Sequence, residues 1–319
     1  MNICALELET VPSIPDRQRD ERLLKLAANA SVATALLLMV VKLIAWQITG
    51  SVGLLASLID SVMDGCASLL NWVAIRYSLM PPDSDHRFGH GKAEPLAALV
   101  QSGFIGGSAL FLMVHSFRRL FDPLPIEQIS VGIYVMAFSM VITIILVTFQ
   151  RFVMKRVAST TIEADSLHYI TDLVTNAMVL LALLLATIGL TQFDAICGIA
   201  IGIYIILCGY KIGRKSIDML MDRELSDDEK EHIYRAIFRR DRVAGVHDLR
   251  TRRSGQNTFI QLHIELDGQL PLVIAHDVAE DIELELSDMF NGADVVIHQD
   301  PSGVVDETLH DRRTPSDYA

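Results

Sequence analysis

Four residues of metal-binding type stand inside two long apolar stretches of the chain. Asp60 and Asp64 are four residues apart in SLIDSVMDGCASLLNW, and His168 and Asp172 have the same spacing in EADSLHYITDLVTNAMVLLALLL. Residues four apart on a helix lie on one face, one turn from each other. Two helices that each present two such side chains supply the four donors of a tetrahedral divalent metal site.

The apolar surroundings make an unpartnered charge costly. An ionisable side chain at the centre of a bilayer costs about 2.5–3.5 kcal/mol on insertion scales, so these residues need either a cation or a polar partner. Pairing inside a helix bundle is the alternative interpretation, and Lys42 is the one basic residue at a matching depth in the other apolar stretches. Three carboxylates and one imidazole favour Zn²⁺, Fe²⁺, Cd²⁺, Co²⁺ or Mn²⁺ over Mg²⁺ and Ca²⁺. We therefore expect a transition-metal site.

A second group of ligand-type residues lies in the polar segment DSDHRFGHGK. Asp83, His86 and His90 fall within eight residues and suit a metal, with solvated loop histidines as the alternative. The GHGK of this segment is not a phosphate loop, because His86 replaces its first glycine and Ala93 replaces the Ser or Thr that would hold Mg²⁺. No other segment has a phosphate-loop pattern. We therefore expect no nucleotide binding, and an ion gradient as the energy source.

A third group lies in the C-terminal part of the chain. His247, His263, His276, His298 and Asp300 all fall on predicted helices or strands. His298 and Asp300 share one face of a strand because they are two residues apart. These residues predict a metal cluster, with chance surface histidines as the alternative.

Six apolar segments are long enough to hold the first group in a membrane, since about 20 apolar residues span a bilayer as a helix. We expect a polar tail at 1–22 and a six-helix transmembrane domain at 23–221. The spans are predicted at about 24–48, 52–79, 93–120, 129–154, 162–189 and 195–220.

Basic residues predict the orientation of these spans. Lysines and arginines gather in the N-terminal tail, around residues 76–92, at 151–156 and at 211–215, whereas the links after the first and fifth spans have none. Cytoplasmic loops are enriched in Lys and Arg, so we expect both termini in the cytoplasm. Only Arg118 and Arg119 go against the pattern.

Residues 222–302 have the periodicity of a water-facing domain. DDEKEHIYRAIFRR predicts a helix capped by Ser226, and NTFIQLHIEL alternates apolar with polar residues, as a half-buried strand does. GVHDLRTRRSG and ADVVIHQDP predict two further strands, and LVIAHDVAEDIELELSDMF predicts a helix. The order αββαβ indicates a small, ferredoxin-like α+β domain with helices on one face of a sheet. We expect residues 303–319 to be a free tail.

Composition agrees with this division and excludes several classes. Hydrophobic residues make up 51% of the chain, mean hydropathy is +0.36, and the acids behind the net charge of −12 concentrate after about residue 222. An acidic chain argues against nucleic-acid binding. Four scattered cysteines predict no disulfide framework, and the N-terminus has no signal-peptide pattern. No nucleophile–base arrangement accompanies the metal ligands, so an enzyme is not expected.

Together these segments resemble the cation diffusion facilitator family over roughly residues 24–302. The resemblance is carried by GSVGLLASLIDSVMDGCASLLNWVAIRYS, HRFGHGKAEPLAAL, EADSLHYITDL, LMDREL, HDLRTRRSG, FIQLHIELDG and VVIHQDP. It implies that the first group is the transport site, that the loop group is a second, looser site, and that the third group is a two-metal site bridged by Asp300. It also implies a homodimer with a salt bridge between Lys92 and Asp222 near its hinge.

The function that follows from the ligands and the resemblance is divalent metal export. We expect a multi-pass protein of the bacterial inner membrane that moves Zn²⁺, and also Cd²⁺ or Fe²⁺, out of the cytoplasm in exchange for protons. Metal binding requires deprotonated ligands, so protons and metal compete for the same residues. The alternatives are a membrane-anchored metal sensor and a passive metal pathway.

Overall fold

The computed structural model describes residues 17–50, 52–121, 130–186, 192–304 and 312–318. The chain divides into two compact units, one that includes Gln18–Ile217 and one that includes Asp218–Ala319. Each unit has its own hydrophobic core.

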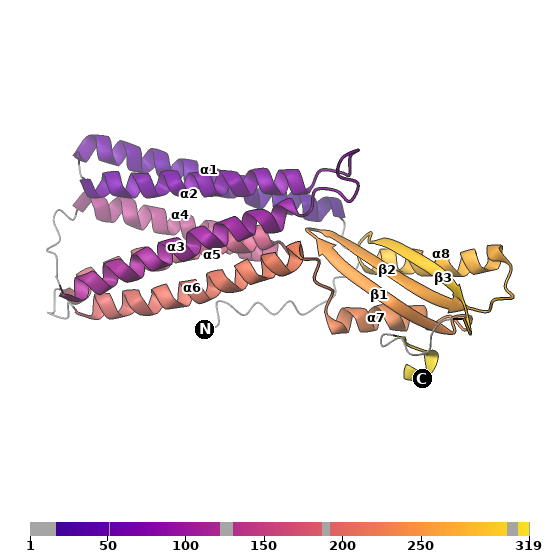
Figure 1. The fold of residues 1–319 in the computed structure, drawn as a ribbon. Coiled ribbons are helices and arrows are strands. Elements are labelled where there is room, and N and C mark those ends of the chain that lie inside the picture. Colours follow the sequence, from indigo (N-terminus) through magenta and orange to yellow (C-terminus); the bar gives the residue numbers. More distant parts are fainter. Residues whose placement is uncertain (1–16, 51, 122–129, 187–191, 305–311, 319) are drawn as a thin grey trace. The chain divides into compact units, whose positions relative to one another are not determined.

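The first unit contains six long helices in the part of the chain that the structure describes (Figure 1). Each predicted span has a helical counterpart. These helices are α1 (Arg17–Thr49), α2 (Val52–Ser78), α3 (Ala93–Phe121), α4 (Ser130–Met154), α5 (Thr160–Ala186) and α6 (Gln192–Leu220).

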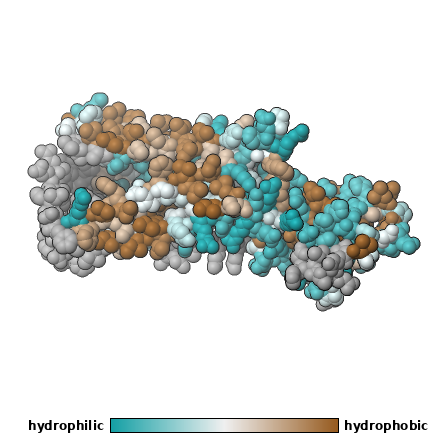
Figure 2. Space-filling model, in the orientation of Figure 1, coloured by the Kyte–Doolittle hydropathy of each residue, from teal (hydrophilic) through white to brown (hydrophobic). Residues whose placement is uncertain are grey.

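Four stretches in this unit are long and apolar enough to cross a membrane. They lie in α1 to α4, at Gln18–Thr49, Ser57–Ser78, Ala93–Arg118 and Tyr134–Met154, among the described residues. The outside of the helices is correspondingly apolar: the side chains of Leu36, Phe111 and Ile145 are each more than half exposed. Figure 2 shows hydrophobic residues over much of this unit's visible surface. An apolar surface of this extent indicates contact with lipid rather than water.

The helix α1 begins earlier than the sequence predicts. Residues 17–22 were expected in the polar tail, but they form the first turns of α1. A pair between Lys25 Nζ and Glu21 Oε2, 3.6 Å apart and four residues apart in sequence, supports this polar start. The rest of the predicted tail lies outside the described residues.

Close packing between α3 and α6 depends on small residues. Ile105 of α3 packs with Ile205 and Ile212 of α6 in one buried cluster. A Cβ atom at Gly202 would overlap the side chain of Met113, so this position on α6 must stay glycine for the two helices to approach. The same cluster includes Leu167 of α5, which fixes this helix against the pair.

The second unit is the predicted small α+β domain. Its elements are α7 (Asp227–Ile237), β1 (Gly245–Ser254), β2 (Asn257–Leu266), α8 (Leu272–Met289) and β3 (Asp294–Pro301). The sheet order is β1-β2-β3, with β1 antiparallel and β3 parallel to β2. The alternation predicted for β2 is confirmed from Ile260 to Ile264, where the apolar side chains are fully buried and Gln261 is exposed. It is wrong at Glu265, which is also buried. The helices contribute Ile233, Ile237, Ile282 and Leu286 to the same core.

The capping of α7 is also as predicted. The Ser226 hydroxyl accepts from the backbone N–H of Glu229, and the Glu229 carboxylate accepts from the backbone N–H of Ser226. This reciprocal capping box satisfies two N–H groups that the helix itself leaves unpaired.

The C-terminal end is not a free tail. Arg313 forms an antiparallel bridge with Val246 at the start of β1, through backbone hydrogen bonds of 2.9 and 2.8 Å. Arg312 donates two hydrogen bonds, of 2.7 and 2.9 Å, to the carboxylate of Glu265, which is only 1% exposed. Tyr318 stacks on Phe238 with 5.2 Å between ring centroids. We call residues 312–318 the C-terminal strap; the sequence prediction was wrong here because these contacts are all long-range.

Candidate metal centres

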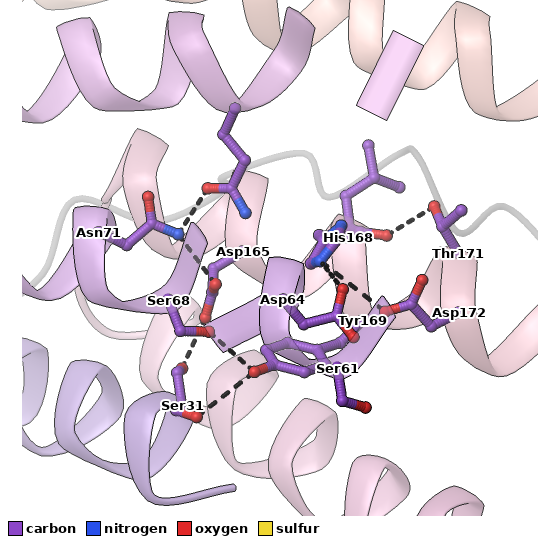
Figure 3. Close-up of polar contacts among 12 residues, drawn as sticks. Ser31, Ser61, Asp64, Ser68, Asn71, Asp165, His168, Tyr169, Thr171 and Asp172 are labelled. Atoms are coloured by element: carbon purple, nitrogen blue, oxygen red, sulfur yellow. Dashed lines mark hydrogen bonds and ion pairs between the residues drawn. The ribbon is translucent and has the colours of Figure 1, made fainter. Parts of the chain in front are cut away.

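Three of the four residues predicted in the apolar helices converge between α2 and α5 (Figure 3). His168 Nε2 lies 3.0 Å from Asp64 Oδ1 and 3.8 Å from Asp172 Oδ2. One ligand-type atom from each residue lies within 4.8 Å of the other two. Asp60, one turn before Asp64, is exposed and is not part of this group among the described residues. We call Asp64, His168 and Asp172 the intramembrane cluster.

The donors of this cluster suit a divalent transition metal. Zinc binds nitrogen and oxygen ligands at about 2.0–2.2 Å, so small side-chain movements would bring all three donors to one ion. Asp172 Oδ2 is buried and has no hydrogen-bond partner among the described atoms. A buried carboxylate oxygen without a donor is costly, and a bound cation would remove that cost.

A buried polar network lies one turn from the cluster and has no counterpart in the sequence predictions. Its centre is Asp165 of α5, which is 1% exposed. Asp165 Oδ1 accepts from Asn71 Nδ2 of α2 at 2.9 Å. Asp165 Oδ2 accepts from Ser31 Oγ of α1 and from Gln150 Nε2 of α4, both at 2.6 Å. Asn71 Nδ2 also donates to Gln101 Oε1 of α3 at 2.6 Å, so the network links five helices. Figure 3 shows Ser31, Asn71 and Asp165 of this network.

This network positions the intramembrane cluster. Asp165 and His168 are three residues apart on α5, and residues at this spacing are neighbours on a helix surface. Tyr169 adds a second tie, because its hydroxyl lies 2.8 Å from Ser68 Oγ of α2. The rotation of α5 about its axis, and with it the direction of the His168 side chain, is therefore fixed against α1, α2 and α4.

The loop residues Asp83, His86 and His90 also lie together. Asp83 Oδ1 is 3.3 Å from His86 Nδ1, and Asp83 Oδ2 is 3.2 Å from His90 Nε2. The backbone N–H of His86 donates to Asp83 Oδ1 at 2.6 Å, and this bond lowers the pKa of the Asp83 carboxyl. His90 is buried with Nδ1 lacking a hydrogen-bond partner among the described atoms, which leaves a donor atom for a metal.

The C-terminal histidines form a cluster across the three strands. His263 pairs with His247 on one side and with His298 on the other, so the three rings lie in adjacent strands. Asp300 Oδ2 is 2.7 Å from His263 Nδ1 and 3.3 Å from His247 Nε2. Asp300 Oδ1 is 3.3 Å from His298 Nε2. Asp300 thus faces all three imidazoles, the arrangement expected of a bridging carboxylate.

We call His247, His263, His298 and Asp300 the C-terminal cluster, and two further residues differ from its prediction. Asp248 groups with His247 and His263, although the sequence did not predict it as a ligand. Its backbone has a positive φ of 51°. His276 lies on α8, is exposed, and is near Glu280 rather than the cluster. The residues suit a resident metal, because both ring nitrogens of the buried His247 lack a hydrogen-bond partner among the described atoms.

Comparison with known proteins decides the family. Sequence models of the cation efflux transmembrane domain and of the cation efflux protein cytoplasmic domain match residues 28–221 and 225–302. The chain belongs to the cation efflux family. It is 48% identical over 289 residues to the cation-efflux pumps FieF of Yersinia pestis (strain Pestoides F) and Yersinia pseudotuberculosis (serotype O:3, strain YPIII). These matches cover 91% of this chain and 96% of each relative. The resemblance to cation diffusion facilitators is confirmed.

Solved structures match part of this cation efflux protein. The zinc form of CzrB is 31% identical, with a TM-score of 0.25, and the match covers 27% of this chain and 99% of that chain. The metal-bound C-terminal domain of the CzcD transporter from Thermotoga maritima is 32% identical, with a TM-score of 0.24, over 25% of this chain and 93% of that chain.

Membership in the cation efflux family makes the chain a membrane transporter rather than an enzyme. The predicted pair of Lys92 and Asp222 stays a prediction, because these residues belong to the two separately described units. Within its own unit, Asp222 Oδ1 lies 3.3 Å from Arg252 Nη1.

Proposed function

We propose that this cation efflux protein exports Zn²⁺, and also Cd²⁺ or Fe²⁺, across the bacterial inner membrane in exchange for protons. The intramembrane cluster carries the proposal. Two carboxylates and an imidazole converge between helices whose outer surfaces are apolar. Ionisable residues at such a depth mark substrate or proton pathways in membrane proteins.

All six helices span the bilayer in this proposal, with both termini in the cytoplasm. The helices α5 and α6 have 27 and 29 residues. At about 1.5 Å per residue each is roughly 40 Å long, which exceeds the ~30 Å hydrocarbon thickness. Both helices lie within residues 28–221, which match the cation efflux transmembrane domain, and this supports the proposal.

Protons drive the export in this mechanism because they compete with the metal for the same ligands. A metal ion requires deprotonated carboxylates and a neutral imidazole, so binding releases protons and protonation expels metal. Asp64, His168 and Asp172 would bind the ion from the cytoplasm, with Asp60 as the fourth ligand. A second arrangement of the helices would then expose the ion to the other side, where protons replace it.

The C-terminal cluster would lie in the cytoplasm and hold Zn²⁺ as a resident metal that joins two copies of the chain. His247, His263, His298 and Asp300 provide its ligands, and the loop residues Asp83, His86 and His90 provide a looser site. The family of the second unit, a cation efflux cytoplasmic domain, supports a homodimer. Lys92 and Asp222 would form the salt bridge near the hinge.

Transport into proteoliposomes tests the proposal. We expect an acidic interior to accelerate Zn²⁺ uptake. The rate of uptake should fall at least tenfold in Asp64→Asn, a substitution that keeps the size of the side chain. Asp241→Asn, at an exposed position of the second unit, is the matched control and should transport like the native protein.

Each alternative predicts a different outcome. Uptake that depends on Asp64 but ignores the pH gradient would indicate a passive metal pathway. Zn²⁺ binding to the second unit without any uptake would leave a membrane-anchored metal sensor.

A further inference from the structure

The side chain of Lys42 places a positive charge inside the helical unit. From α1, Lys42 Nζ donates to Ser61 Oγ at 2.6 Å and to the backbone oxygen of Ser57 at 3.1 Å, both on α2. Lys42 is half-buried, and Ser61 is 1% exposed. Among the residues that the structure describes, the ammonium forms no ion pair with a carboxylate. Its hydrogen-bond partners on α2 are neutral oxygens.

The position of these oxygens relates Lys42 to the intramembrane cluster. Ser57, Ser61 and Asp64 follow the spacing i, i+4, i+7 on α2, so they lie along one face of this helix. Ser61 and Asp64 are i, i+3 neighbours, separated by about one turn or ~5 Å along the axis. Figure 3 shows Ser61 and Asp64 in the same close-up of the cluster. The ammonium is therefore hydrogen-bonded about one turn of α2 away from Asp64, and among the described residues it forms no ion pair with the carboxylates of the proposed site.

The charges of the proposed site explain why the Lys42 ammonium is present beside it. Asp60, Asp64 and Asp172 carry three negative charges when they are ionised. A divalent cation leaves one of these unbalanced, and the Lys42 ammonium offsets it. Without metal, the same ammonium partly neutralises three carboxylates that would otherwise repel each other in a medium of low dielectric constant.

We propose that Lys42 is a resident counter-ion of the transport site, held by Ser61 at a distance that limits metal affinity and allows release. The inference rests on the proposed function. Two effects give it a direction. The ammonium repels the incoming divalent cation, and it stabilises the carboxylates of the metal-free state. Both effects weaken metal binding relative to a site without Lys42, and both speed the departure of the ion.

Substitution of the charge tests this role through the concentration dependence of Zn²⁺ transport in proteoliposomes. Lys42→Met removes the ammonium and keeps the length of the side chain. We expect its KM to fall about tenfold and its maximal rate to fall as well, because the ion binds more tightly and leaves more slowly. Lys42→Arg keeps the charge and should restore much of the native KM. Lys25→Met, the same substitution at a half-exposed position in the first turns of α1, is the matched control and should behave like the native protein.

Ser61→Ala provides a test with the opposite sign. It removes the hydroxyl that holds the ammonium and leaves the charge in place, so Lys42 can approach the carboxylates and compete with the metal. We expect KM to rise by about threefold or more. This variant decides the question if Lys42→Met does not fold.

Three results separate the two proposals. A native protein that transports no Zn²⁺ would overturn the proposed function. Native transport combined with an unchanged or raised KM in Lys42→Met would overturn the counter-ion role alone. An unchanged or lowered KM in Ser61→Ala would do the same.

Discussion

Replacing Gln150 by methionine removes one of the three neutral donors that surround the Asp165 carboxylate. Asp165 is buried, and in the described part of the chain its oxygens receive hydrogen bonds from Asn71, Gln150 and Ser31. A hydrogen bond to a charged group contributes about 1.5–3 kcal/mol. Methionine has a similar volume and leaves no large cavity. Gln150→Met should therefore destabilise the protein by about 1.5–3 kcal/mol.

Asp165→Asn should cost much less, about 1 kcal/mol or below, since polar groups of the network are available to re-pair. Asn71 Oδ1, Gln101 Nε2 and Gln150 Oε1 have no hydrogen-bond partner among the described atoms. If the amides of Asn71 and Gln101 both turn over, Asn71 Oδ1 accepts from the new amide at position 165 and from Gln101 Nε2. The hydrogen bonds that join positions 71, 101 and 165 are thereby kept without a buried charge.

Thermal unfolding in detergent micelles of the single and double variants measures this difference. A shift of about 2–4 °C per kcal/mol places Gln150→Met roughly 3–12 °C below the native protein. In the Asp165→Asn background the same substitution should cost about 1 kcal/mol less, because its partner is then neutral. Gln18→Met, at an exposed position of α1, is the control. If Asp165→Asn proves as destabilising as Gln150→Met and the two effects add, the description of Asp165 as an anion solvated by neutral donors is wrong.

Three further predictions concern the second unit. Arg312→Met leaves the buried Glu265 carboxylate without its two-bond partner, so calorimetry of the full chain should show a loss of about 2–4 kcal/mol; no change would mean that the strap contributes nothing to stability. Burial, followed by the nearby Glu231, raises the pKa of Tyr318 from 10.0 to about 12; a raised folded-state pKa means that strap docking is fully stabilised below pH 10 and lost as pH rises through about 12. Titration of tyrosinate absorbance in the native protein and in Tyr318→Phe checks this, because the variant should lack a tyrosine that ionises near pH 12. If the variant instead lacks a tyrosine that ionises near pH 10, the prediction is wrong. His263→Ala should lower the zinc content of the purified protein, because His263 belongs to both groups of ligand-type residues at the C-terminal cluster. His232 is an exposed histidine of α7 outside those groups, so His232→Ala should keep the native zinc content.

The local parts of the structure could be predicted because their causes are local. Apolar length predicts the helices, period-2 alternation predicts β2, and the i, i+4 spacing predicts that Asp64 shares a helix face with Asp60. Spacing does not predict which of these acids points at His168, because this depends on the rotation of α2 against α5. The structure brings Asp64 to His168 and leaves Asp60 exposed.

The network around Asp165 could not be predicted from any single stretch. Ser31, Asn71, Gln101 and Gln150 are isolated polar residues on four different helices, and each has an ordinary structural interpretation by itself. Only the packing of the bundle shows that they converge on one carboxylate. The same holds for the C-terminal strap, whose residues look like a polar tail until Glu265, Val246 and Phe238 are placed beside them.

The C-terminal strap also affects how the protein tolerates C-terminal fusions and whether its sheet can pair with strands of other chains. An outer strand with free backbone groups is a template for edge-to-edge aggregation, and the bridge from Arg313 to Val246 occupies such groups at the start of β1. A purification tag or fluorescent protein fused directly after Ala319 would be separated by one residue from Tyr318, whose ring is stacked on Phe238. A fusion of this kind would pull on the strap and expose both the strand edge and the carboxylate of Glu265. Tagged preparations would then differ from the native chain in solubility for a reason unrelated to metal.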